Sequence, residues 1–160
     1  MKSTDRKKEP YKVGVLSVVK HDYLPRAIAA HPRFSLSFVS DEISRPEWTH
    51  ERNQKFADEF QIPYIKDIAV AIKDNQIDAV AVSPEAERHC ELAIIAAEAG
   101  LHIVVDKPLS TNTHKCDKLI DAVNKNGVSC LVWNRNYLPA LIQANQKVSS
   151  GKIGKLLSLH

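Results

Sequence analysis

Candidate ligand-binding residues stand at the ends of short apolar runs in this sequence. Asp41 follows the run FSLSFVS (34–40) and lies 24 positions after Ser17, which ends the first run. In a dinucleotide site, an acid about 20 residues after the phosphate turn accepts the hydroxyl groups of the adenosine ribose and repels a 2′-phosphate. The spacing therefore predicts that Asp41 binds the ribose of NAD, although an acid here could also do no more than cap a loop.

The turn from Ser17 to Asp22 would carry the phosphate-binding fingerprint of such a site. Aligning G-x-G-x-x-G with this turn puts Ser17, Val19 and Asp22 where the three glycines belong. Between Gly14 and Gly100 the sequence has no glycine at all. The glycines normally let backbone N–H groups approach a pyrophosphate, so we expect the Val19 side chain to face the phosphates and weaken their binding.

Charged residues of the same turn have opposing effects on a diphosphate. Asp22 is a suitable N-cap for the helix that carries Pro25, but its charge would repel a diphosphate at that helix terminus. Lys20 and His21 could offset this repulsion by direct contact. The sequence thus predicts a dinucleotide site with a degenerate phosphate turn.

The elements that must position these residues alternate between strand and helix patterns. Helical patterns separate the short apolar runs, which lie at 12–17, 34–40, 62–65, 77–83, 101–106 and 128–133, with a last run at 155–160. Several runs are apolar throughout, which is typical of parallel strands covered on both faces. Gly100 and Gly127 stand where a helix would end in a left-handed turn before a strand. The pattern predicts a doubly wound, Rossmann-like parallel sheet in a three-layer α/β/α domain.

In such a sheet, ligands bind beyond the carboxyl ends of the strands, where the strand order reverses. The candidate residues are therefore those that leave each predicted strand. They lie in the segments 17–22, 40–42, 83–89, 106–108 and 133–137.

Length and composition limit the class of protein. The chain has 160 residues, 44% hydrophobic and 26% charged, which suits one ordinary globular domain after a flexible leader at 1–10. Its net charge is +3 without long blocks of one sign, which argues against a nucleic-acid partner. No apolar run reaches the roughly 20 residues of a membrane helix, and no signal peptide follows the start, so we expect a cytoplasmic protein without a membrane partner.

The three cysteines do not suggest a metal site. Cys90, Cys116 and Cys130 are an odd number and form no C-x-x-C pair. Histidines stand near two of them, but no spacing for four ligands follows. We expect reduced thiols in the core and no bound metal.

Four segments carry a resemblance to a known family. The segment GLHIVVDKPLSTN (100–112) resembles the G-K-H-V-x-x-E-K-P segment of the Gfo/Idh/MocA oxidoreductases, the glucose-fructose oxidoreductase and inositol dehydrogenase family. Three further segments are similar to other parts of the family, namely KFADEFQIPYIKDI (55–68), SPEAERHCELAIIAAEAG (83–100) and GKIGKLLSLH (151–160). The resemblance runs from about Tyr11 to the end of the chain, and the D-K-P segment is its most specific part.

The resemblance implies that residues 11–154 form an amino-terminal Rossmann domain that binds NAD, with NADP less expected. Members of the family add a carboxy-terminal domain on an open antiparallel sheet, where most substrate contacts and a catalytic histidine reside. The chain would then end where that domain begins, at 155–160, and a sugar- or polyol-type substrate would bind through the missing domain. The apolar residues of this tail would be left uncovered and could form a homodimer.

The resemblance also implies roles for single residues. Ser83 and Pro84 would line the cofactor cleft, and His89 would begin the next helix near the cofactor. Asp106 and Lys107 would face the nicotinamide end, where the Lys107 ammonium could act catalytically by exchanging a proton with the substrate oxygen during hydride transfer. The rest of the expected cofactor-binding set, beside Asp41, is Ser17, Val18, Val19, His21 and Asn134.

Other roles stay open at these positions. Lys107 could be an exposed lysine at a strand end, and His89 could be a helix-start histidine satisfied by the backbone. Asp106 replaces the family's usual glutamate, and the glycine fingerprint is lost. The chain could therefore be the cofactor half of an oxidoreductase, or a Rossmann-scaffold sensor or interaction protein with weak or no dinucleotide binding.

Overall fold

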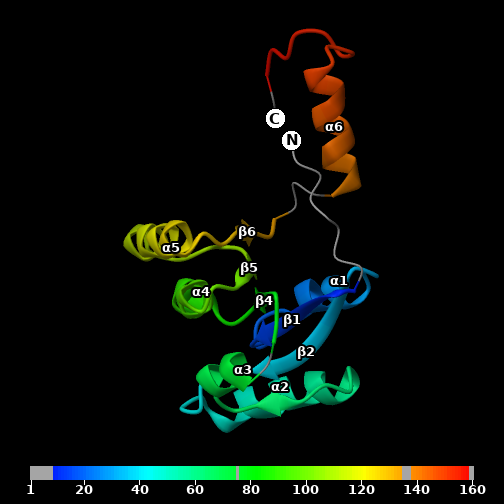
Figure 1. Cartoon of the computed structure of the whole chain (residues 1–160). Helices are drawn as coiled ribbons and strands as arrows, with labels where there is room; N and C mark the ends of the chain where they lie inside the picture. The colour runs from blue at the N-terminus through cyan, green and yellow to red at the C-terminus, as the bar shows by residue number, and fades with distance from the viewer. Residues whose placement is uncertain (1–8, 75, 135–137, 159–160) are drawn as a thin grey trace.

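A computed structural model of the chain describes residues 9–74, 76–134 and 138–158. Six strands form one sheet in the order β3-β2-β1-β4-β5-β6, and every strand pairing is parallel (Figure 1). The elements are β1 Tyr11–Leu16, α1 Tyr23–Ala29, β2 Phe34–Ser40, α2 Glu47–Glu59, β3 Tyr64–Ile65, α3 Ile68–Asp74, β4 Ala79–Val82, the 3₁₀ helix η1 Ala86–Arg88, α4 His89–Glu98, β5 His102–Val105, α5 Thr113–Asn126, β6 Cys130–Val132 and α6 Pro139–Ser149. This confirms the predicted doubly wound parallel sheet.

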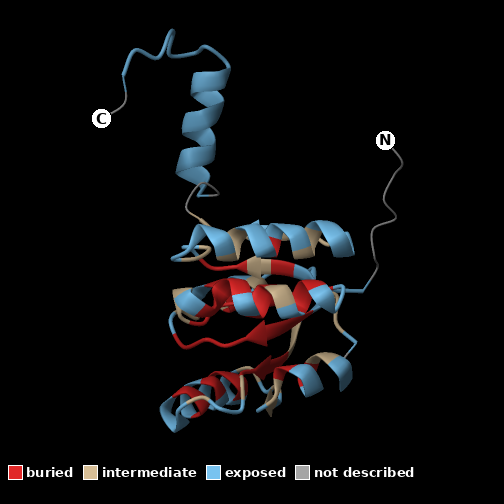
Figure 2. Cartoon of the chain, turned by 90° about the vertical axis from the view of Figure 1, so that its left-hand side faces the viewer, coloured by how far each residue is buried: buried red, intermediate tan, exposed pale blue. Residues whose placement is uncertain are grey.

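Helices cover the two faces of the sheet and bury an apolar core on each. On one face, Phe56 of α2 packs with Val15 and Val39 of the sheet. On the other face, α3, α4 and α5 pack against the sheet and bury residues such as Phe38 and Leu119. Figure 2 shows the buried residues concentrated in the strands and on the helix faces that contact them. Burial on both sides explains why these strands are apolar throughout.

The strand and helix ends that the sequence predicts are present. Gly100 and Gly127 both have a left-handed backbone, with φ angles of 76° and 64°, and each is followed by a strand. At the start of α5, the Asn112 side chain accepts a hydrogen bond from the His114 N–H at 2.9 Å. Gly14 lies inside β1, where a Cβ atom would come within 2.5 Å of the Phe38 ring. Only glycine therefore lets Phe38 pack flat against β1.

The structure describes only part of the last apolar run, 155–160. Residues 155–158 form no strand, and residues 159–160 lie outside the described chain. A strand needs a neighbour to bond with, and the six described strands pair only with one another. Leu157 is 87% exposed in this tail.

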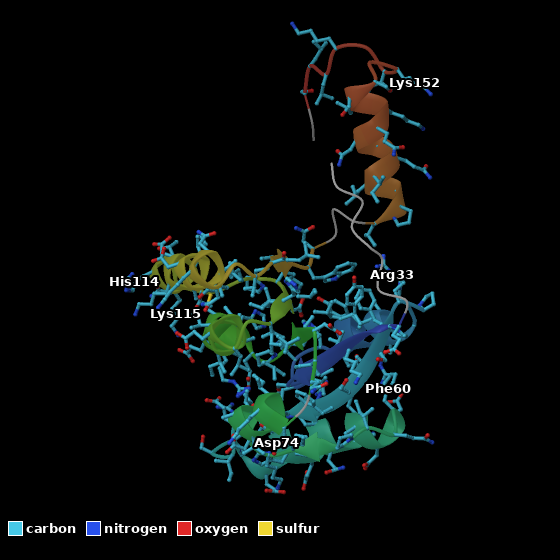
Figure 3. All side chains as sticks on the ribbon, viewed as in Figure 1. Arg33, Phe60, Asp74, His114, Lys115 and Lys152 are labelled. Atoms are coloured by element: carbon cyan, nitrogen blue, oxygen red, sulfur yellow. The ribbon has the colours of Figure 1, made fainter. Side chains whose placement is uncertain are left out.

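Helix α6 stands beyond the edge strand β6 and away from the helix layers (Figure 1). It buries none of its residues, and its side chains spread around it clear of the sheet in Figure 3. Its exposed apolar residues include Leu141, Ile142 and Val148. Within the described ranges, no helix is long and apolar enough to cross a membrane.

Candidate functional site

The strand order reverses beside β1, which lies between β2 and β4. Ser17 leaves β1 with a φ angle of 63°, which is the left-handed conformation that the first fingerprint glycine would adopt. Its N–H donates to the Ser40 carbonyl oxygen at 2.9 Å, so the turn is anchored to the end of β2. At Ser17 the turn therefore has a backbone conformation that favours glycine.

Two serine hydroxyl groups mark this point as a place for a polar ligand. The Oγ atoms of Ser17 and Ser83 are buried and have no hydrogen-bond partner in the described chain. They stand at the carboxyl ends of β1 and β4, which are neighbouring strands. Because buried hydroxyl groups are nearly always paired, these two fit the polar groups of a dinucleotide bound across the switch point.

Both valines of the turn are buried. Val18 packs into the core on the α2 side, and Val19 is also buried. The Val18 N–H donates to Asn53 Oδ1 at 2.8 Å, because α2 brings this buried amide under the turn. One backbone N–H of the turn is therefore already paired within the protein.

The expectation that the Asp22 side chain caps α1 is wrong. Asp22 precedes α1 but makes no capping hydrogen bond with its side chain. Its carboxylate instead accepts from Arg26 Nε at 2.8 Å, one helical turn later. Arg26 also binds Glu59 on α2 and holds the pKa of that carboxyl below its usual value through a hydrogen bond. Arg26 is thus shared between two acids and offsets the charge of Asp22 only in part.

Asp41 lies at the end of β2 as expected, but its side chain is fully buried. Its Oδ1 accepts from Arg88 Nη1 at 2.7 Å, from Arg88 Nη2 at 2.8 Å and from the Glu42 N–H at 2.8 Å. Its Oδ2 accepts from Asn53 Nδ2 at 2.9 Å. Asn53 therefore links the Asp41 carboxylate to the turn at 17–22.

Arg88 comes from η1, after β4, and lies at the centre of an acidic cluster. Besides Asp41 it contacts Glu42 at 2.9 Å and Glu85 at 3.1 Å, and Arg45 contacts Glu85 at 2.9 Å. Burial raises the pKa of Glu85, but a hydrogen bond from its own backbone and the charges of Arg88 and Arg45 outweigh it, so the pKa falls below its usual value. Sequence analysis missed Arg88, because nothing in the loop pattern after β4 indicates that it reaches the end of β2.

A second buried carboxylate organises the other half of the cleft. Asp106, after β5, is buried, and its Oδ2 lies 3.0 Å from His21 Nδ1. Its Oδ1 accepts hydrogen bonds from the Tyr23 hydroxyl and, at 2.7 Å, from the Lys107 N–H. Asp106 thus ties the phosphate turn to the start of the D-K-P segment, rather than lying open to the cofactor.

A cavity of about 690 Å³ opens beside this carboxylate. Residues from four separate parts of the chain line it, namely His21, Tyr23, Lys107, Trp133, Asn134 and Leu138. The fold thereby brings together three residues of the predicted site, His21, Lys107 and Asn134. Lys107 is exposed, so its ammonium group is available to a ligand. Sequence analysis missed Tyr23 in this cavity.

His89 begins α4 as predicted, but it is buried. Its Nδ1 lies 2.6 Å from the Pro108 carbonyl oxygen and its Nε2 lies 3.1 Å from the Pro84 carbonyl oxygen. These contacts match the alternative of a histidine satisfied by the backbone. His89 therefore holds together the segments that follow β4 and β5.

Comparison with known proteins shows which family the chain matches. The model of the oxidoreductase family GFO_IDH_MocA, with an NAD-binding Rossmann fold, matches residues 16–133. The chain is 38% identical over 88 residues to levoglucosan dehydrogenase of Pseudarthrobacter phenanthrenivorans, which covers 54% of the chain and 23% of that protein. It is 34% identical over 91 residues to myo-inositol 2-dehydrogenase of Thermotoga maritima, which covers 56% of the chain and 27% of that protein.

Solved structures share the fold. Myo-inositol 2-dehydrogenase from Lactobacillus plantarum is similar with a TM-score of 0.76 at 17% identity, over 93% of the chain and 44% of that protein. The WlbA dehydrogenase from Bordetella pertussis, solved with NADH and UDP-GlcNAcA, has a TM-score of 0.76 at 19% identity, over 92% of the chain and 44% of that protein. The chain thus corresponds to less than half the length of these proteins.

Proposed function

Because the chain belongs to the Gfo/Idh/MocA oxidoreductase family and has its NAD-binding Rossmann fold, we propose that it is the cofactor-binding part of a dehydrogenase for a sugar- or polyol-type substrate. The names of levoglucosan dehydrogenase and myo-inositol 2-dehydrogenase support this substrate class. The observation that carries the proposal is the cavity in which Lys107, His21 and Asn134 meet at the carboxyl edge of the sheet. The rest of the substrate pocket would come from a second domain.

The cofactor would lie across the switch point. NAD, when bound, supplies a nicotinamide carbon that accepts or returns a hydride. The left-handed Ser17 turn and the unpaired Ser83 hydroxyl would hold its phosphate and ribose groups, and Pro84 would line the cleft. The nicotinamide end would then point to the cavity beside Lys107.

Lys107 would handle the proton in this cavity. When a substrate hydroxyl is oxidised, its carbon loses a hydride and its oxygen must lose a proton, and an ammonium or amine at hydrogen-bond distance can exchange it. Asp106 accepts hydrogen bonds from the Lys107 N–H, from His21 in the turn and from Tyr23 at the start of α1. It therefore fixes the backbone that carries this ammonium group. In this role Asp106 and Tyr23 are positioning residues.

A sensor or interaction protein with little dinucleotide binding is the second candidate. The observation that favours it is that Asn53 already pairs the Val18 N–H, while Arg88 already pairs the expected ribose carboxylate. Each pre-formed bond removes a group that a dinucleotide would otherwise use.

Energy transfer from Trp133 to NADH tests the proposal directly. The chain has two tryptophans, Trp48 on α2 and Trp133 in the cavity, so Trp48→Phe leaves a single reporter beside the proposed nicotinamide site. We expect NADH to quench this emission saturably, and Trp133→Phe to abolish the signal. The chain alone should not reduce NAD with polyols. Failure to bind NADH at millimolar concentration would favour the second candidate.

A further inference from the structure

We infer that Glu42, and not Asp41, is the carboxylate that accepts hydrogen bonds from the adenosine ribose hydroxyl groups. Glu42 has this role because Arg88 already binds Asp41. The inference rests on the proposed function, because it concerns how the same cleft selects its dinucleotide. It follows from three features of the cluster around Arg88: the saturation of Asp41, the exposure of Glu42 and the net charge.

Asp41 has little capacity left for a ligand. A carboxylate offers about four acceptor sites, and Asp41 already receives four hydrogen bonds, three on Oδ1 and one on Oδ2. It is also completely buried. A ribose presents two neighbouring hydroxyl groups, so binding them here would require Arg88 to leave a buried ion pair without a replacement partner.

Glu42 is placed next to this saturated group and remains open. Its side chain is 44% exposed, and one of its oxygens, Oε2, accepts from Arg88 Nη1 at 2.9 Å. The other oxygen, Oε1, has no hydrogen-bond partner among the described residues. Arg88 therefore holds one edge of the Glu42 carboxylate and leaves the other edge for a hydroxyl donor at the end of β2.

The charge of the cluster favours the same ligand. Three acids, Asp41, Glu42 and Glu85, surround two cations, Arg88 and Arg45, so the cluster carries one net negative charge. Arg88 donates its hydrogen bonds to these acids, so it is poorly placed to bind a phosphate monoester. The cluster should therefore accept a 2′-hydroxyl and repel a 2′-phosphate, with Glu42 as the contacting group.

Paired titrations of NADH and NADPH test the inference, with Trp133 emission in the Trp48→Phe background as the readout. We expect Glu42→Gln to weaken NADH binding by about tenfold, the scale of one hydrogen bond to a charged group, and to improve NADPH binding. Glu87→Gln is the matched control. Glu87 is an exposed acid on η1, the 3₁₀ helix that carries Arg88, and its side chain lies outside the cluster. It should change neither affinity by more than about twofold.

A second variant separates Asp41 from Glu42. Asp41→Asn should lower the melting temperature, because it removes the buried carboxylate that pairs with Arg88, while costing the folded protein less NADH affinity than Glu42→Gln does. Unchanged NADH and NADPH affinities in Glu42→Gln would overturn the inference and leave the proposed function standing. A wild-type chain that binds neither dinucleotide would overturn the proposed function, and the inference with it.

Discussion

Ser17 adopts a backbone conformation that suits glycine, and replacing it with glycine should stabilise the protein. Its φ angle is 63°, and its hydroxyl group is buried without a partner. A left-handed backbone costs a non-glycine residue about 1–2 kcal/mol, and an unpaired buried hydroxyl costs about 1–3 kcal/mol. Glycine returns about 0.5–1 kcal/mol of this gain through its greater freedom in the unfolded chain. We therefore expect Ser17→Gly to raise the free energy of unfolding by about 1–4 kcal/mol.

Two further variants divide this gain between its causes. Ser17→Ala removes the hydroxyl group but keeps the Cβ atom in the left-handed conformation, so it should give about half of the gain. Gln61→Gly removes a second left-handed non-glycine residue, with a φ angle of 54°, at an exposed position away from the site. It should gain a few tenths of a kcal/mol from the backbone alone.

Urea and thermal unfolding measure these differences. For a protein of this size each kcal/mol shifts the melting temperature by about 2–4 °C, so Ser17→Gly should melt at least about 2 °C higher than the wild type. If Ser17→Gly proves no more stable than Ser17→Ala, the backbone at Ser17 carries no strain. The argument that this turn reproduces a glycine conformation would then fail.

Four further predictions concern the core, the acid-sensitive cluster, the thiols and the tail. Gly14→Ala should lower the urea midpoint, because its Cβ would meet the Phe38 ring at 2.5 Å and overpacking costs about 1–3 kcal/mol, and Phe38→Leu in the same chain should restore part of it. The pKa of Glu85 lies below the ordinary value of 4.5 for a glutamate, so its share of stability is present above that pH and is lost as the pH falls through the lowered pKa. Glu85→Gln should flatten part of the fall in the urea midpoint below pH 4.5. Burial, followed by the neighbouring Cys116 thiol, raises the pKa of Cys90 to about 11, so peptide mapping after iodoacetamide treatment at about pH 8 should find Cys90 unmodified in the native protein and modified in urea. Leu157→Asp should reduce any concentration-dependent association in sedimentation, since this tail residue is 87% exposed.

The sequence predicts the fold well because its signals are local. The run FSLSFVS predicts β2 to the residue, and Gly100 and Gly127 stand at two helix ends where the backbone is left-handed. A short run that is apolar throughout and lies between helical patterns is typical of a strand covered on both faces. Residues 155–158 lie outside the six-stranded sheet.

The candidate site was predicted in position but not in chemistry. Asp41 and Asp106 stand at the strand ends where the spacing puts them. Their partners are far away in sequence: Arg88 lies 47 residues after Asp41, and His21 lies 85 residues before Asp106. Only the folded sheet brings these groups together, so no local pattern could indicate that both carboxylates are already paired.

The charged residues at these strand ends are of two kinds, buried and paired or exposed. The buried carboxylates, Asp41 and Asp106, each collect several donors from neighbouring strand exits, and so act as ties across the carboxyl edge of the sheet. The charged groups that follow them directly in sequence, Glu42 and Lys107, keep an exposed face. An ion buried with its partners is costly to redirect, whereas its exposed neighbour can meet a ligand without breaking the fold. The same arrangement at the ends of β2 and β5 leaves an acid for the ribose end of a dinucleotide and a lysine for its nicotinamide end.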